Sequence, residues 1–74
     1  MKSDPLQKRL GQAIRQRREA LGYSQDSMAD AIGMHRAYYS AVERGEKNLT
    51  LRTVERLARA VEARVSELMA EAGD

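Results

Sequence analysis

The segment from residue 25 to residue 45, QDSMADAIGMHRAYYSAVERG, constrains the fold of this chain most, because it reads as two short helices joined by a tight turn. Met28, Ala29 and Ile32 fall on one face of the first helix at helical spacing. Gly33 follows and can adopt a positive φ, where a side chain would be unfavourable. The pattern therefore predicts a helix, a sharp turn and a second helix.

The second helix of this pair is predicted to bury Tyr39 and Val42, which stand three residues apart. Tyr38 is adjacent to Tyr39 on the helix, so its side chain is expected to point outward. The exposed face then consists of His35, Arg36, Ala37, Tyr38, Ser40 and Ala41. A short helix with basic, hydroxyl and small residues on its exposed face suits insertion into a DNA major groove.

This segment resembles the helix-turn-helix of phage-repressor-type regulators, the Cro/cI-like or XRE-like family. The resemblance rests on Gln25 at the helix start, Ala29 at the helix–helix contact, Gly33-Met34 in the turn and the closing Glu43-Arg44-Gly45. It covers about residues 6 to 69, and the run from His35 onward, HRAYYSAVERGEKNLTLRTVERLARAVE, is most similar to restriction–modification controller proteins. The resemblance implies an all-α, compact five-helix lambda-repressor-like domain and a sequence-specific DNA-binding transcriptional regulator.

The rest of the chain also reads as helix. Asp4-Pro5 is typical of a helix start, and Gly22 of a helix end. Ser24, Thr50 and Ser66 are predicted to cap the second, fourth and fifth helices. The apolar residues expected to face inward in the last two helices are Leu51, Val54, Leu57, Ala58 and Val61, then Val65, Leu68 and Met69. We therefore expect one domain over residues 1–74, with the helix-turn-helix at about 25–44 and a dimerisation region at about 50–72.

Composition narrows the class of protein. The chain has 74 residues and no cysteine, which excludes disulfides and cysteine zinc sites, so oligomerisation is the remaining common way to stabilise so small a domain. No long apolar run is present, so we expect neither a membrane span nor a secretory signal peptide. These features fit a cytoplasmic protein, and the resemblance implies a bacterial or phage origin.

Charge is distributed unevenly along the chain. The net charge is +2, and residues 1–49 carry nine Lys and Arg against six Asp and Glu, whereas residues 50–74 carry four against five. Phosphate contacts dominate the affinity of proteins for nucleic acids, so a DNA-binding face should be positive. The basic excess lies in the half of the chain that contains the predicted helix-turn-helix.

Arg36 is the leading candidate for reading a base, because it stands near the start of the second helix and can donate two hydrogen bonds to guanine. The other expected base contacts are His35, Ala37, Tyr38, Ser40 and Ala41. His35 has no companion ligands at metal-binding spacing, so no metal site is expected. Expected phosphate contacts are Gln25, Arg44, Lys47 and Asn48.

Other roles follow only from the resemblance. It implies a structural ion pair between Arg18 and Glu43, and it places Glu62 where many relatives have a left-handed glycine. It also places the dimer interface in the last two helices, and the candidate interface residues are Val61, Val65, Leu68 and Met69. Two recognition helices in a two-fold dimer would lie about 34–36 Å apart, one turn of DNA.

The expected partners are a second copy of the chain and a double-stranded, (pseudo)palindromic operator, with RNA polymerase as a further partner where the regulator activates; no membrane partner is expected. Nothing in the sequence supports catalysis or a cofactor, because no cysteine, phosphate loop or Ser/His/Asp set is present. A phage-type repressor and an antitoxin-like autoregulator remain alternatives on the same fold. A protein–protein adaptor is an alternative of another class, although the basic and polar residues over 35–48 favour DNA.

Overall fold

A computed structural model describes residues 5–73 of the chain. These residues form five α-helices, which confirms the expected all-α class. The helices are α1 (Leu6–Ala20), α2 (Gln25–Ala31), α3 (Arg36–Glu43), α4 (Leu51–Ala60) and α5 (Val65–Ala72). In the described part of the chain, no helix has both the length and the apolar character that crossing a membrane requires.

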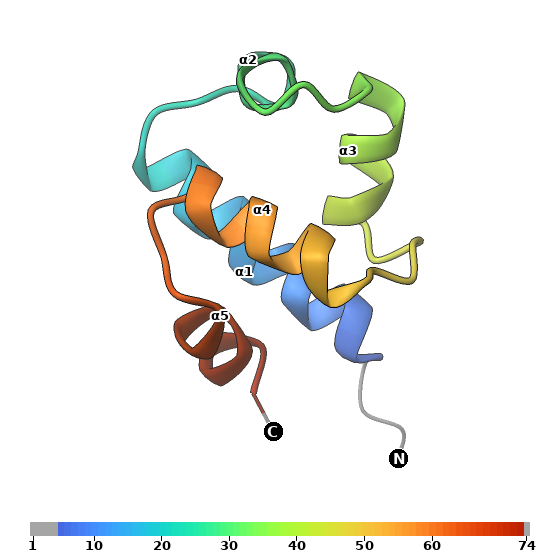
Figure 1. Cartoon of the computed structure of the whole chain (residues 1–74), viewed down its shortest axis with the longest axis vertical. Helices are drawn as coiled ribbons and strands as arrows, with labels where there is room; N and C mark the ends of the chain where they lie inside the picture. Colours follow the sequence, from blue (N-terminus) through green and yellow to red (C-terminus); the bar gives the residue numbers. More distant parts are fainter. Residues whose placement is uncertain (1–4, 74) are drawn as a thin grey trace.

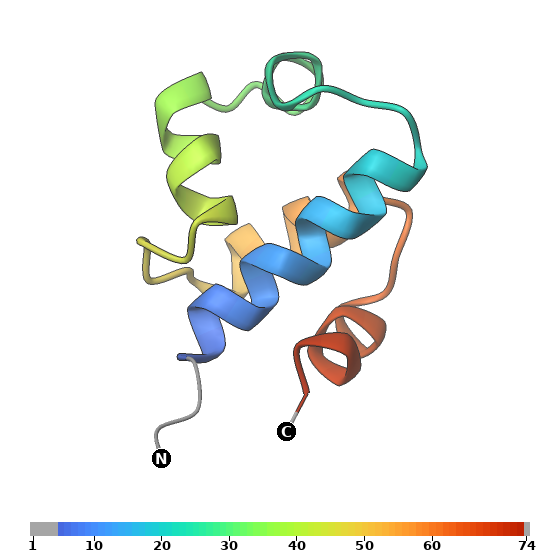
Figure 2. The ribbon, with the colours of Figure 1, turned by 180° about the vertical axis from the view of Figure 1, so that it is seen from behind.

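The long helix α1 runs through the middle of the molecule, and the shorter helices pack around it. It contacts both α3 and α5, while α2 packs on α3 and α4 packs on α5. Figure 1 shows α2 and α3 together at one end, and the reverse view in Figure 2 shows α5 at the opposite end. The helix-turn-helix therefore stands clear of the C-terminal helix.

Local sequence explains where most of the helices begin. The hydroxyl of Ser24 accepts a hydrogen bond from the Ser27 backbone N–H at 3.0 Å, and the hydroxyl of Thr50 accepts one from Thr53 at 3.1 Å. Both predicted caps are thus confirmed. The predicted cap at Ser66 is wrong: α5 already begins at Val65, and its start is fixed by the Glu67 carboxylate, which accepts from the backbone N–H of residue 64 at 2.8 Å. The expected cap at Asp4 lies outside the described residues.

Gly33 and Glu62 are two of the positions with a left-handed backbone, the first as the sequence predicted and the second as the resemblance implied. Gly33 has a φ of 64° in the turn between α2 and α3, and Glu62 has a φ of 57° after α4. Glycine adopts this conformation at little cost, whereas a residue with a side chain is strained by about 1–2 kcal/mol. Glu62 is therefore a strained position that the packing of α4 and α5 must hold in place.

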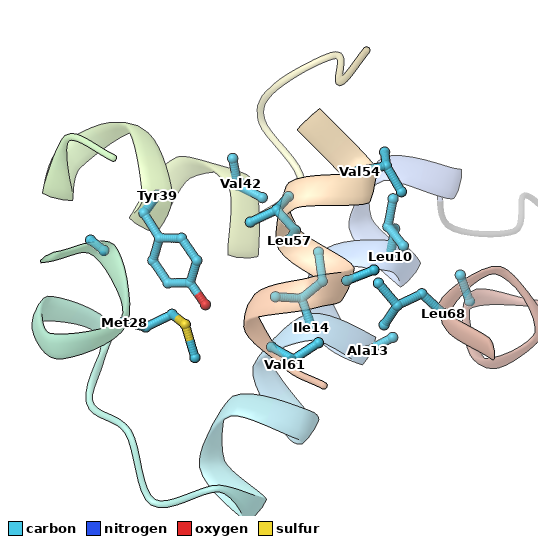
Figure 3. Close-up of a cluster of buried hydrophobic side chains, with 13 residues drawn as sticks. Leu10, Ala13, Ile14, Met28, Tyr39, Val42, Val54, Leu57, Val61 and Leu68 are labelled. Atoms are coloured by element: carbon cyan, nitrogen blue, oxygen red, sulfur yellow. The ribbon is translucent and has the colours of Figure 1, made fainter. Parts of the chain in front are cut away.

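One hydrophobic core joins all five helices (Figure 3). Tyr39 is fully buried, which confirms that it rather than Tyr38 faces inward. The core includes residues from every helix, among them Leu10, Ile14, Met28, Tyr39, Val42, Val54, Leu57, Val61 and Leu68. Because α2, α4 and α5 are too short to be stable alone, this shared burial supplies most of their stability.

The core corrects three expectations about the C-terminal half. Val61 is only 2% exposed and Leu68 is completely buried, so neither is available to a second subunit. The reason is that α5 packs directly on α1 and fills the space between them with these side chains. Leu51, which was expected to face inward, is instead 79% exposed at the start of α4.

Candidate nucleic-acid interface

A buried ion pair fixes α3 against α1. Arg18 donates from Nε to Glu43 Oε2 at 2.7 Å and from Nη2 to Glu43 Oε1 at 3.2 Å, and both residues are at most 6% exposed. Gln25, at the start of α2, donates its amide to the same carboxylate at 2.8 Å. One carboxylate therefore ties the end of α3 to the two helices that precede it.

The surroundings of this carboxylate shift two pKa values. Burial alone would raise the pKa of Glu43, but the hydrogen bonds from Arg18 and its other neighbours outweigh burial and lower the pKa. Burial, together with the nearby Glu43 carboxylate, raises the pKa of the Tyr39 phenol. Over residues 5–73, the Tyr39 hydroxyl is the one buried side-chain polar atom outside hydrogen-bonding geometry. Glu43 is thus charged and Tyr39 neutral at physiological pH.

A close backbone contact reinforces this position of α3. A methyl group at Gly11 would come within 2.5 Å of the Glu43 carbonyl oxygen and 2.6 Å of that of Val42. A methyl group at Gly45, where φ is 76°, would likewise come within 2.5 Å of the Cα of Lys8. Since only glycine fits at both places, α1 can approach the end of α3 closely and hold its direction.

A shallow depression lies between the beginnings of α2 and α3. It collects most of the residues that the sequence singled out for DNA, together with one acidic residue that it did not. Its lining consists of Gln25, Asp26, His35, Arg36, Ala37, Ser40 and Arg44. The structure therefore brings four expected base contacts and two expected phosphate contacts onto one surface.

Two arginines dominate this surface, and each has an acidic partner. The side chain of Arg36 is 72% exposed, and its Nη1 donates to Asp26 Oδ2 at 3.0 Å. Arg44 donates from Nε and Nη2 to the two oxygens of Glu46, each at 3.1 Å, and from Nη1 to the hydroxyl of Ser40. The hydrogen bond and charge of Arg44 lower the pKa of the Glu46 carboxyl.

The loop after α3 carries the remaining candidate phosphate contacts. The amine of Lys47 lies 5.7 Å from the centre of the Tyr38 ring, within the range of a cation–π interaction. Asn48 accepts a hydrogen bond from the amide of Gln7 at 2.6 Å. Tyr38 is half-buried against the core, so only part of its side chain is exposed.

Two other expected base contacts turn out differently. Ala41 is 6% exposed, so the prediction that its methyl group faces a base is wrong; it lies on the side of α3 that turns toward the protein, next to the buried Val42. His35 is exposed but has a local task, because its Nδ1 accepts the backbone N–H of Ala37 at 3.2 Å and caps α3.

Sequence reasoning missed Asp26, Glu46 and Gly11. Asp26 and Glu46 looked like ordinary surface carboxylates. Nothing in the sequence indicates that Asp26 pairs with an arginine ten residues away, or that Glu46 pairs with Arg44 two residues before it. Gly11 did carry a signal, because a glycine inside a strongly helical segment usually has a packing reason.

Comparison with known proteins agrees with this geometry. The family described as Helix-turn-helix matches residues 14–68. The control protein C.SmaI of Serratia marcescens is 38% identical over 64 residues, which are 86% of this chain and 76% of that protein.

Two solved structures extend the comparison to three dimensions. The restriction-modification controller protein C.AhdI from Aeromonas hydrophila is 38% identical with a TM-score of 0.76, covering 82% of this chain and 92% of that one. The clp gene regulator ClgR from C. glutamicum is 28% identical with a TM-score of 0.90, covering 96% and 91%. This chain therefore belongs to the helix-turn-helix family and is homologous to restriction-modification control proteins.

Proposed function

We propose that this protein is a sequence-specific, DNA-binding transcriptional regulator that acts as a homodimer, and that it controls a restriction–modification system. The observation that carries the proposal is the exposed start of α3, where Arg36 and Ala37 stand beside the depression while the end of the helix is fixed by Glu43. A rigid helix with an exposed basic start is what base reading in the major groove requires. Homology to named control proteins supplies the restriction–modification part.

In the proposed complex, α3 enters the major groove and Arg36 donates two hydrogen bonds to a guanine. Such a bidentate contact gives roughly 1–3 kcal/mol of discrimination against other bases. Arg44 and Gln25 lie at the rim of the depression, and Lys47 and Asn48 lie in the loop after α3. We expect these residues to contact phosphates, which fixes the register of α3 rather than its sequence preference; Asn48 can do so only from the edge of the apolar groove that it also lines.

The proposed dimer uses a surface that only partly overlaps the one the sequence suggested. An apolar groove lies where α1, α4 and α5 meet, and it is lined by Leu6, Gln7, Leu10, Asn48, Leu49, Leu51, Val54 and Met69. Leu51 and Leu6 are 79% and 46% exposed at this groove. Of the four interface residues expected from the sequence, Met69 lies here, and Val65 is half-buried at the start of α5.

This groove fits a second copy of the chain because it combines a protruding side chain with a hollow. In a two-fold interface the same patch must be complementary to itself, so the Leu51 of each subunit can enter the groove of the other. The assembly would cover apolar surface that is unusually exposed for so small a domain. As a dimer on a (pseudo)palindromic operator upstream of restriction–modification genes, the protein would meet RNA polymerase when it activates.

Selection of binding sites from random-sequence DNA tests the proposal. We expect recovery of a two-fold symmetric site with half-sites about one helical turn apart. Gel shifts should then show affinity for that site that falls steeply with salt. Failure to enrich any sequence, together with weak binding at low salt, would favour a protein–protein adaptor instead.

A further inference from the structure

The two arginines of the depression are held in different ways. Arg44 is bound on both edges of its guanidinium, by Glu46 on one side and Ser40 on the other. Within residues 5–73, Arg36 is bound through a single nitrogen, Nη1, by Asp26. Since a guanidinium has five donors in one plane, Arg36 keeps an edge on which it can still make a bidentate contact.

The contact between Arg36 and Asp26 also bridges the turn of the helix-turn-helix. Asp26 lies in the first turn of α2, and Arg36 is the first residue of α3. A flexible arginine at the start of a helix is thereby held in relation to both helices. Its remaining donors are oriented before any DNA arrives, which reduces the entropy lost on binding.

Stability does not explain this pair. The two side chains are 72% and 64% exposed, and ion pairs between such exposed groups contribute only about 0–1 kcal/mol. A carboxylate is moreover an unexpected group on a surface that is proposed to meet phosphates. The Asp26 carboxylate therefore affects how Arg36 distinguishes one DNA sequence from another.

A neighbouring carboxylate affects a phosphate and a guanine edge differently. A phosphate carries a full negative charge, so Asp26 repels it and weakens its contact with Arg36. The guanine edge carries two uncharged acceptors and is repelled much less. Phosphate contacts supply essentially all of the non-specific affinity, so the carboxylate weakens binding to random DNA more than binding to the operator.

We propose that Asp26 is a specificity-determining residue: it positions Arg36 and makes this arginine a poor phosphate ligand, so that Arg36 binds strongly only where a guanine faces it. This inference rests on the proposed function and assigns a task to a residue that does not itself need to contact a base. It predicts that loss of the Asp26 charge improves binding to the wrong DNA.

The test is Asp26→Asn, which keeps the size of the side chain and an oxygen that can accept from Arg36. Dissociation constants are measured over a salt series for a site selected by the wild type and for a random duplex. We expect affinity for random DNA to rise roughly three- to ten-fold and its salt slope to steepen by about one, as one more arginine neutralises a phosphate. Affinity for the selected site should rise less, so the ratio of the affinity for the selected site to the affinity for random DNA should fall.

Two further variants separate this effect from a general change in charge. Glu55→Gln removes an exposed carboxylate that pairs with Arg59 on α4, outside the depression, and should leave the ratio unchanged. In an Arg36→Ala background, Asp26→Asn should no longer alter the ratio, because the residue through which Asp26 acts is missing. Circular dichroism of each variant verifies that the helices are intact.

The possible outcomes are distinct. Equal tightening on both DNAs, or the same fall in the ratio with Glu55→Gln, would reduce Asp26 to one more negative charge and overturn the inference. A wild type that discriminates while Asp26→Asn is unchanged would also overturn it and leave the proposed function standing. A wild type that prefers no sequence would overturn the proposed function and this inference together.

Discussion

Gly11 of α1 lies directly against the backbone of Glu43 at the end of α3, so close that a methyl group at Gly11 would stand 2.5 Å from the Glu43 carbonyl oxygen. The same Glu43 accepts hydrogen bonds from Arg18 through its side chain. The backbone and the side chain of Glu43 therefore both fix the end of α3 against α1. The direction of α3 depends on this contact.

Gly11→Ala is expected to destabilise the protein, because the added methyl group meets backbone atoms that cannot rotate away. Overpacking of this kind costs typically about 1–3 kcal/mol. The displacement of α3 should also weaken DNA binding beyond what the loss of folded protein explains. Thermal unfolding and gel shifts on the same samples measure the two effects. Gln12→Ala, at an exposed neighbouring position of α1, is the control and should change neither.

Arg36→Ala should keep the fold and lose sequence preference. The side chain is exposed, so its removal leaves the core intact, while a bidentate base contact worth roughly 1–3 kcal/mol disappears. Affinity for the selected site should fall by that amount, and affinity for random DNA should fall less. Arg59→Ala, an exposed arginine of α4, serves as the control. Equal losses on both DNAs would identify Arg36 as a phosphate contact.

Acid should weaken the contribution of Glu43 to stability. Its pKa is lowered in the folded protein, so its stabilising effect is complete above the ordinary glutamate pKa of about 4.3 and is lost as the pH falls through the lowered value. Glu43→Gln removes this charge and leaves the buried Arg18 with only the more distant carboxylate of Glu19, 3.9 Å from its Nη2. Urea unfolding should show a large difference between wild type and variant at pH 7 that narrows toward pH 3. A constant difference would mean that the charge of Glu43 contributes nothing.

Leu51→Glu and Leu68→Glu should behave differently although both add a charge to an apolar position. Leu51 is exposed at the proposed dimer groove, so its variant should remain helical, become monomeric and bind the operator much more weakly. Leu68 is completely buried, so its variant should fail to fold.

Sedimentation and circular dichroism measure these two outcomes. Leu21→Glu alters another exposed leucine, outside the groove, and should leave the dimer intact. If Leu51→Glu also remained dimeric at low micromolar concentration, the interface would have to lie elsewhere on the molecule.

Short-range patterns along the chain were enough to predict the helices, their order and most of their ends. These features depend on neighbours a few residues apart, such as the serine pair at the start of α2 and the left-handed position at Gly33. The choice between Tyr38 and Tyr39 was likewise local, since the spacing to Val42 decides which of them faces inward. Information of this short range can be read directly from a single chain.

Only the tertiary structure decided which apolar residues of the C-terminal half belong to the monomer. Hydrophobicity is similar for Val61, Leu68 and Leu51 and does not tell them apart. Whether each side chain is buried or exposed depends on the packing of distant helices, such as that of α5 on α1, more than forty residues away in the sequence. The partner of Arg36 was also decided there, because the packing of α3 on α2 sets which carboxylate its guanidinium can reach. Long-range packing places these groups, and it leaves no periodic trace in the sequence.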